Sequence, residues 1–214
     1  MKFSTAVYSS KQRLSQVAYF PKDHIGNATC LCVALFALSL GSCSLAVAQQ
    51  ALATQPNVVL IMADDLGYSD VGSYGATDVQ TPNIDSLARE GVRLTDFYSN
   101  GPTCSPTRAA LISGRYQQRY GLEMQLINRH REQGDGLPVT GLSLPQLLSD
   151  HGYITGLTGK WHLGWEADNS PNAHGFDYFF GFKNGWVDYY QHTSVRGEPD
   201  LFENDRSEPC VPAT

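Results

Sequence analysis

The feature that most constrains the fold is an unbroken apolar run at residues 58 to 63, which ends in Asp64, Asp65 and, two residues on, Gly67. A short apolar run without polar alternation is typical of a strand in a buried parallel sheet. Further along, expected helices at residues 82 to 90 and 145 to 151 precede expected strands at 92 to 98 and 153 to 157. With 42% hydrophobic residues among 214, the chain can bury a core. This order predicts an α/β protein with βαβ units.

Asp64 and Asp65 follow the first strand directly, at the carboxyl end where open α/β sheets bind ligands. Two adjacent carboxylates repel each other, so a cation between them would stabilise the pair. Calcium fits better than zinc because no His or Cys is interleaved with these oxygen ligands. The alternative is a solvated turn that happens to carry two acids.

Residues 103 to 115 read Thr-Cys-Ser-Pro-Thr-Arg-Ala-Ala-Leu-Ile-Ser-Gly-Arg, which predicts a helix that starts at Cys104. The positive end of a helix lowers a thiol pKa and favours an anionic intermediate. Arg108 lies four residues on and therefore shares a helix face with Cys104. The alternative is a capped helix with a buried cysteine and a surface arginine.

A third segment, Gly-Lys-Trp-His-Leu-Gly at residues 159 to 164, carries Lys160 and His162. On an extended backbone, side chains two residues apart point to the same side. An ammonium group neutralises anionic oxygens, and an imidazole exchanges protons. The alternative is an ordinary strand end in contact with water.

Taken together, these segments resemble the cysteine-type sulfatases, over residues 56 to 182 and in the same order. Residues 104 to 108, Cys-Ser-Pro-Thr-Arg, resemble the signature that marks a cysteine for oxidation to formylglycine, and residues 159 to 164 resemble the second signature of the family. Residues 174 to 182 resemble its aromatic turn. The resemblance implies an alkaline-phosphatase-like α/β/α sandwich with a mixed, mainly parallel sheet, which we expect to be incomplete in this chain.

The resemblance also implies a mechanism. The gem-diol of formylglycine derived from Cys104 attacks the sulfur of a sulfate ester, and Ca²⁺ is bound by Asp64, Asp65 and the Cys104 position. Arg108 and Lys160 stabilise the oxyanions, and His162 handles the gem-diol proton. The implied partners are a sulfated small molecule or polysaccharide and a formylglycine-generating enzyme.

Three hypotheses remain open from the sequence. The first is hydrolysis of sulfated carbohydrates or aryl sulfate esters. The second is a phosphonate or phosphodiester hydrolase of the same superfamily. The third is an inactive truncated product, since sulfatases of this kind are more than twice as long and the remaining metal ligands are expected beyond Thr214. Asn184 is a weak candidate for a sulfate contact, because the residues after Phe182 depart from the family pattern.

The N-terminal residues predict export. Basic residues precede an apolar stretch from Leu31 to Val47, and Ala46-Val-Ala48 resembles a cleavage site. Residues 1 to 48 are therefore expected to be a signal peptide, and residues 49 to 214 the N-terminal part of a sulfatase catalytic domain in the periplasm or outside the cell. A lipoprotein site at Cys43 is the alternative, and only then would the protein be anchored to a membrane.

Charge and cysteine content narrow the function further. The net charge of −6 gives no support for nucleic-acid binding. Because the chain is acidic, it can bind an anionic substrate only where positive charge is concentrated locally. Cleavage after Ala48 would leave Cys104 and Cys210. A disulfide between these two would abolish the nucleophile, so Cys210 is expected to be free or paired elsewhere.

Overall fold

The computed structural model describes residues 2–10, 55–127 and 132–207. Residues 2–9 and the described residues from 57 to 207 belong to one compact unit. The strands are β1 (Lys2–Ser10), β2 (Val58–Asp64), β3 (Tyr153–Lys160), β4 (Tyr178–Phe182), β5 (Phe202–Glu203) and β6 (Arg206–Ser207). The α-helices are α2 (Pro82–Glu90), α3 (Cys104–Ser113) and α5 (Leu144–Asp150), and short 3₁₀ turns lie at 68–70, 72–74, 117–120, 167–169 and 172–174. None of the described helices has the length and apolar character needed to cross a bilayer.

The strands form one mixed sheet in the order β2-β1-β3-β4-β5-β6. β3 and β4 are parallel, whereas β1 with β2, β4 with β5 and β5 with β6 are antiparallel. The expectation of a mainly parallel sheet is therefore wrong for the described pairings. The physical reason is local: β5 and β6 form a tight hairpin, and β2 pairs with the N-terminal strand rather than with a strand that follows a crossover helix.

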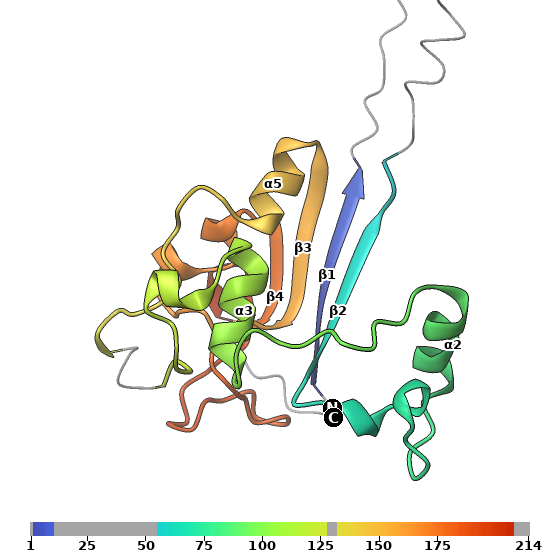
Figure 1. Ribbon diagram of the computed structural model, residues 1–214. Helices are drawn as coiled ribbons and strands as arrows, with labels where there is room; N and C mark the ends of the chain where they lie inside the picture. Colours follow the sequence, from blue (N-terminus) through green and yellow to red (C-terminus); the bar gives the residue numbers. More distant parts are fainter. Residues whose placement is uncertain (1, 11–54, 128–131, 208–214) are drawn as a thin grey trace, which may run out of the picture. The chain divides into compact units, whose positions relative to one another are not determined.

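Helices cover one face of the sheet. α3 and α5 pack against each other, and α5 packs on β3 (Figure 1). Alternate residues of β3 point into this contact, so Tyr153, Thr155 and Leu157 are buried. Ala109 and Ile112 of α3 complete the core together with Phe179 of β4 and Trp161. The α/β class is confirmed, and the sheet is incomplete as expected.

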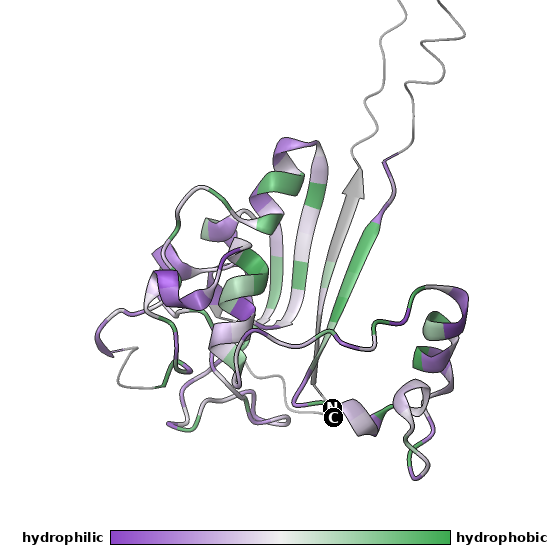
Figure 2. Cartoon of the chain, in the orientation of Figure 1, coloured by the Kyte–Doolittle hydropathy of each residue, from purple (hydrophilic) through white to green (hydrophobic). Residues whose placement is uncertain are grey.

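The opposite face of the sheet carries exposed apolar side chains among the described residues. Val59 and Ile61 of β2 are 58% and 57% exposed, and Ile154 and Phe180 alternate to the same face. Figure 2 shows the hydrophobic run of β2. The prediction of a strand buried on both faces is wrong here, because none of the described helices covers this side.

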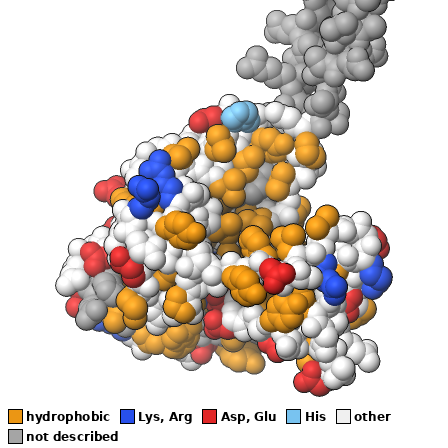
Figure 3. Space-filling model, viewed as in Figure 1, with side chains coloured by type: hydrophobic (Ala, Val, Ile, Leu, Met, Phe, Trp, Pro, Cys, Tyr) orange, Lys and Arg blue, Asp and Glu red, His pale blue; other side chains and the backbone are white. Residues whose placement is uncertain are grey.

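Hydrophobic side chains also gather beside α3 on the helix-bearing face, as Figure 3 shows. Leu60 and Met62 of β2 line an apolar hollow there, together with Leu111 and Leu157. Both faces of β2 are therefore apolar, as expected from a sequence without polar alternation.

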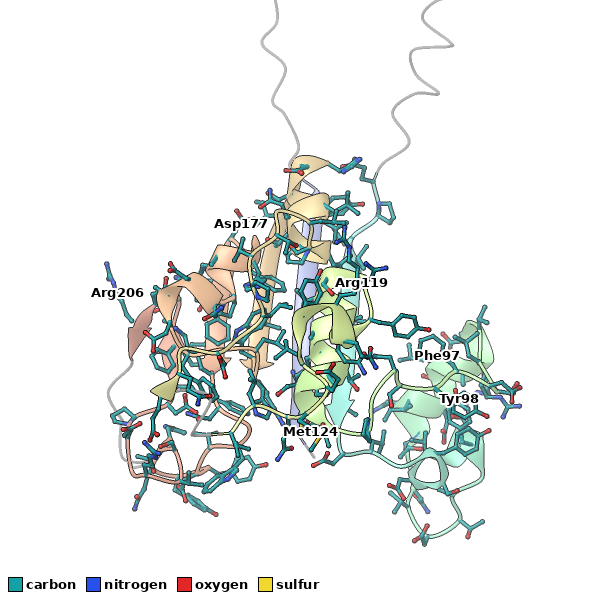
Figure 4. The ribbon with its side chains drawn as sticks, turned by 60° about the vertical axis from the view of Figure 1, so that its left-hand side comes forward. Phe97, Tyr98, Arg119, Met124, Asp177 and Arg206 are labelled. Carbon is teal, nitrogen blue, oxygen red and sulfur yellow. The ribbon has the colours of Figure 1, made fainter. Side chains whose placement is uncertain are left out.

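Two sequence predictions about secondary structure are wrong. Residues 92 to 98 form no strand, because none of the described strands pairs with them; Phe97 and Tyr98 are each 78% exposed and lie outside the sheet (Figure 4). The expected aromatic turn at residues 174 to 182 instead contains β4, whose aromatic residues alternate between the two faces. The helix predictions are confirmed: α2 begins at Pro82 after Thr81, and Ser143 caps α5 by accepting from the Gln146 N–H at 3.2 Å.

The N-terminal strand lies within the predicted targeting segment. β1 occupies the position between β2 and β3, in register with Ala6 opposite Leu60. The export prediction stays a prediction, and its apolar stretch from Leu31 to Val47 lies outside the described residues, as do Cys43 and Cys210. If residues 1 to 48 are removed, β1 is removed with them.

The parallel pairing of β3 with β4 depends on a pair of glycines. Gly159 and Gly181 face each other in the register, and a Cβ at Gly181 would collide with the Gly159 carbonyl oxygen. We expect Gly181→Ala to lower the free energy of unfolding by about 2 kcal/mol, since backbone cannot move aside without loss of ladder hydrogen bonds. Urea unfolding monitored by tryptophan fluorescence measures this. Thr158→Ala, at an exposed position of β3, is the control, and equal stability of the two variants would contradict the prediction.

Candidate active site

A cavity of about 660 Å³ opens where β2 and β3 end. Its lining includes Asp64 at the end of β2 and Asp65 after it, Cys104 at the start of α3, Lys160 at the end of β3, and His162 two residues further on. Four of the segments singled out in the sequence thus meet through the fold: the acidic pair, the cysteine, the Lys-Trp-His segment and Asn184. Trp165, Gly185 and Trp186 add a further wall.

Asp64 is held between two buried cations. Its Oδ2 accepts from Lys160 Nζ at 2.9 Å, and its Oδ1 accepts from Arg108 Nη2 at 3.3 Å. The three side chains are only 10%, 2% and 7% exposed, in that order. Burial raises the pKa of Asp64, but the hydrogen bonds and charges of Lys160 and Arg108 outweigh it, so the pKa lies below its usual value. The carboxylate therefore stays ionised at neutral pH.

Arg108 binds both the Asp64 carboxylate and the backbone at the end of β3. Its Nη1 donates to the Lys160 carbonyl oxygen at 2.6 Å, which ties α3 to the end of β3. Burial lowers the pKa of the guanidinium, although Asp64 opposes the shift. Arg108 shares the apolar hollow with Leu111 and Trp161 and is not among the described residues that line the larger cavity. The structure thus places it against Asp64 rather than facing the cavity.

Cys104 occupies the first position of α3, as the sequence predicts. Its thiol is partly exposed, and its Sγ lies with carboxylate oxygens of Asp64 and Asp65 in a cluster whose atoms are all within 4.8 Å of one another. Unpaired N–H groups at the start of a ten-residue helix favour negative charge at this point. The thiol therefore lies at a place suited to an anionic intermediate.

His162 is buried and has an unusual backbone. Its φ of 58° lies in the left-handed region, so the expected extended arrangement of Lys160 and His162 is wrong, although both residues reach the same cavity. Asp65, with φ 56°, adopts the same conformation after β2. Sparsely populated backbone conformations of this kind cluster at functional sites.

The imidazole of His162 has one partnered nitrogen. Nε2 lies 2.8 Å from the Leu126 carbonyl oxygen, whereas Nδ1 is buried with no hydrogen-bond partner among the described residues. Burial, together with the charges of Lys160 and Arg108, lowers the pKa of His162 to about 4, although the Leu126 hydrogen bond opposes the shift. The ring is therefore neutral at pH 7.

The segment after β4 is fixed by Asp200. The buried carboxylate of Asp200 accepts from the backbone N–H groups of Lys183 and Asn184, both at 3.1 Å. Asn184 reaches the cavity wall, but its Oδ1 accepts from Trp165 Nε1 at 2.8 Å. Asp200 is 17 residues from Lys183 in the sequence, and only the fold brings the two together. Sequence reasoning also missed Leu126 and Gly185, since a carbonyl group and a close backbone approach leave no local signal.

The cluster of Asp64, Asp65 and Cys104 offers some of the ligands that a hard cation needs. Calcium prefers six to eight oxygen ligands. Asp65 offers an exposed carboxylate, whereas both oxygens of Asp64 already bind cationic side chains. A thiol is a poor calcium ligand, but an oxygen group at the Cys104 position would be a good one. The donor chemistry therefore fits calcium, and these residues supply part of a ligand set.

Removing the charge of Asp64 would take the carboxylate counter-charge away from two buried cations. We expect Asp64→Asn to lower the free energy of unfolding by about 3 kcal/mol. Asp65→Asn is the matched control, because the Asp65 side chain is exposed and asparagine tolerates the left-handed backbone, so its effect should stay below about 0.5 kcal/mol. Urea unfolding of both variants measures the difference. Equal losses would show that the Asp64 ion pairs do not stabilise the fold.

The lowered pKa of His162 makes stability depend on pH. Between pH 4 and 6.5 the unfolded chain binds a proton at His162 that the folded chain does not, so stability is lost as pH falls through this window. The loss attributable to this group approaches about 3 kcal/mol at its acid end. We expect His162→Gln to flatten the dependence, measured by urea unfolding at several pH values. Parallel pH curves for wild type and variant would contradict the assignment.

Comparison with known proteins identifies the family. The sulfatase family model matches residues 56–206. The chain is 42% identical over 159 residues to arylsulfatase J of Mus musculus, covering 72% of this chain and 26% of the relative, and 46% identical over 133 residues to arylsulfatase A of Bos taurus, covering 61% and 26%. It thus spans about a quarter of the length of these relatives.

Solved structures agree with this match. The crystal structure of Ps i-CgsB is 35% identical with a TM-score of 0.63, covering 72% of this chain and 36% of that one. The same protein in complex with k-i-k-neocarrahexaose gives a TM-score of 0.61 at the same identity and coverage. BT4656 in complex with its substrate D-glucosamine-2-N,6-O-disulfate is 27% identical with a TM-score of 0.50, covering 68% and 26%. On the family model, the related sequences and the shared fold, this chain belongs to the sulfatase family.

Proposed function

We propose that the protein hydrolyses sulfate esters, with Cys104 converted to formylglycine as its nucleophile. The observation that carries the proposal is the position of Cys104 at the start of α3, clustered with Asp64 and Asp65 and open to the cavity that Lys160 and His162 also line. One hydroxyl of the hydrated aldehyde would attack sulfur, the bond between sulfur and the ester oxygen would break, and the substrate's alcohol would leave with the proton of the attacking hydroxyl. The second hydroxyl would then lose a proton and expel sulfate, which restores the aldehyde.

The charges of the site suit this reaction. The chain is acidic overall, with a net charge of −6, yet Lys160 and Arg108 place two cations at the end of β3. Lys160 lines the cavity and can therefore neutralise sulfate oxygens, while Arg108 holds Asp64 in place. His162 is neutral at pH 7, so its unprotonated Nδ1 can accept the hydroxyl proton.

Calcium is the metal proposed for this site. Asp64, Asp65 and the formylglycine oxygen at position 104 would hold it, consistent with the donor chemistry of the cluster. When bound, the ion supplies positive charge that polarises the nucleophile and the sulfate group.

A sulfated carbohydrate is the proposed substrate class. Two similar structures contain k-i-k-neocarrahexaose and D-glucosamine-2-N,6-O-disulfate, and the chain resembles them at 35% and 27% identity. The wall formed by Trp165 and Trp186 supports this class, because a half-exposed indole offers a flat apolar face on which a sugar ring can pack. The proposal extends to a formylglycine-generating enzyme as partner and to export directed by residues 1 to 48.

The test combines a modification assay with a turnover assay. The chain is co-expressed with a formylglycine-generating enzyme, and the mass of the tryptic peptide that contains Cys104 is measured. Turnover of nitrophenyl sulfate is followed in calcium and compared with a nitrophenyl phosphate diester. We expect conversion to formylglycine and faster turnover of the sulfate. Cys104→Ala should abolish turnover, because it removes the nucleophile, while substrate affinity changes little.

Each outcome has a distinct meaning. An unmodified thiol, or turnover retained by Cys104→Ala, would refute the nucleophile assignment. Formylglycine without turnover would mean that this chain alone does not carry the activity. Faster turnover of the phosphate diester would replace sulfate with a phosphorus ester as the substrate.

A further inference from the structure

Ser105 connects α3, the helix that begins with Cys104, to the loop that contains Leu126. It follows Cys104 directly, and its side chain is completely buried. Its Oγ accepts a hydrogen bond at 3.0 Å from the backbone N–H of Leu126, 21 residues further along the chain. A serine in the first turn of a helix usually bonds to its own backbone, so this long-range contact calls for a separate explanation.

The backbone of Leu126 contacts both Ser105 and His162. Its N–H donates to Ser105 Oγ, and its carbonyl oxygen lies 2.8 Å from His162 Nε2. Because a carbonyl oxygen only accepts, Nε2 must carry the proton, and the second nitrogen, Nδ1, is then the basic one. Nδ1 is also the nitrogen without a hydrogen-bond partner among the described residues.

The backbone at Gly185 packs closely against the imidazole ring of His162. A Cβ at this position would lie 2.8 Å from His162 Cε1 and 3.0 Å from Nε2. The absence of a side chain therefore lets the backbone after β4 approach the imidazole closely. The ring is confined by the Leu126 carbonyl and by the backbone at Gly185, so a shift of either would turn it.

We propose that Ser105 is a positioning residue, which fixes the orientation and tautomer of His162 through the Leu126 peptide. Ser105 and Cys104 are neighbours on α3, so the same helix start that presents the nucleophile also sets which imidazole nitrogen is free to take its proton. The effect of this positioning on catalysis rests on the proposed function. The tautomer itself is a property of the folded chain and is measurable without turnover.

The experiment compares two buried serines of α3 in the full chain. Ser105→Ala removes the acceptor for the Leu126 N–H and leaves Cys104, Pro106 and Arg108 unchanged. Ser113→Ala is the matched control: Ser113 is 5% exposed, and its Oγ accepts from the Arg115 N–H at 3.3 Å. Circular dichroism verifies folding, and the mass of the Cys104 peptide reports formylglycine conversion for each variant.

The first readout is the tautomer of His162. Long-range ¹H–¹⁵N NMR spectra at neutral pH, assigned with His162→Gln, distinguish a proton on Nε2 from one on Nδ1. We expect the Nε2–H form in wild type and Ser113→Ala, and a mixture in Ser105→Ala. A wild-type ring protonated on Nδ1 would overturn the inference, even if Ser105→Ala does not fold. So would an unchanged tautomer in Ser105→Ala.

The second readout is kinetic. With equal formylglycine conversion, Ser105→Ala should lower kcat for nitrophenyl sulfate about tenfold and change KM little, because the loss concerns proton transfer. Ser113→Ala should retain wild-type kcat. In a double-mutant cycle, adding Ser105→Ala to His162→Gln should cost nothing more, since Ser105 acts through that ring. Additive losses would overturn the inference.

The two readouts separate this inference from the proposed function. If no variant turns over substrate but the tautomer changes in Ser105→Ala alone, the positioning role stands and the sulfatase proposal for this chain fails. If wild type turns over substrate and Ser105→Ala matches it in kcat and tautomer, the positioning role fails and the proposed function stands.

Discussion

The rest of the site depends on the carboxylate of Asp64, which binds Lys160 and Arg108 at the same time. These residues come from β2, the end of β3 and α3, so one buried anion fixes three elements that are distant in the sequence. Two buried cations without this counter-charge would be strongly destabilising. Since Arg108 lies one helical turn after Cys104, the same interaction also sets the position of the thiol.

Charge and burial explain how an acidic chain concentrates positive charge beside one cavity. The positive charge is concentrated behind and beside the cavity, where Asp64 partly neutralises it and keeps both cations fixed. Desolvation keeps His162 neutral, so it adds no charge but offers a basic nitrogen. Fixed charges and dipoles of this kind stabilise a developing oxyanion without reorganising during the reaction. The site is therefore preorganised by its own buried ion pairs.

Local sequence signals predicted much of the secondary structure. Thr81 and Pro82 marked the start of α2, and the Cys-Ser-Pro-Thr-Arg segment marked the start of α3. These signals are properties of a few adjacent residues, so they survive without tertiary information. The segment with Phe97 and Tyr98 has β-type composition but no strand, because a strand exists only where another strand pairs with it. Pairing is a long-range property that composition does not encode.

The sequence by itself determined the α/β class, the sulfatase resemblance and the chemistry-bearing residues, since the motifs around Asp64, Cys104 and His162 consist of near neighbours. Only the tertiary structure decided how these residues meet. It turned Arg108 toward Asp64 rather than the cavity, gave His162 a left-handed backbone, and brought the Leu126 carbonyl to its ring. The physical reason is that hydrogen bonds and burial between distant segments depend on packing, which no run of adjacent residues specifies.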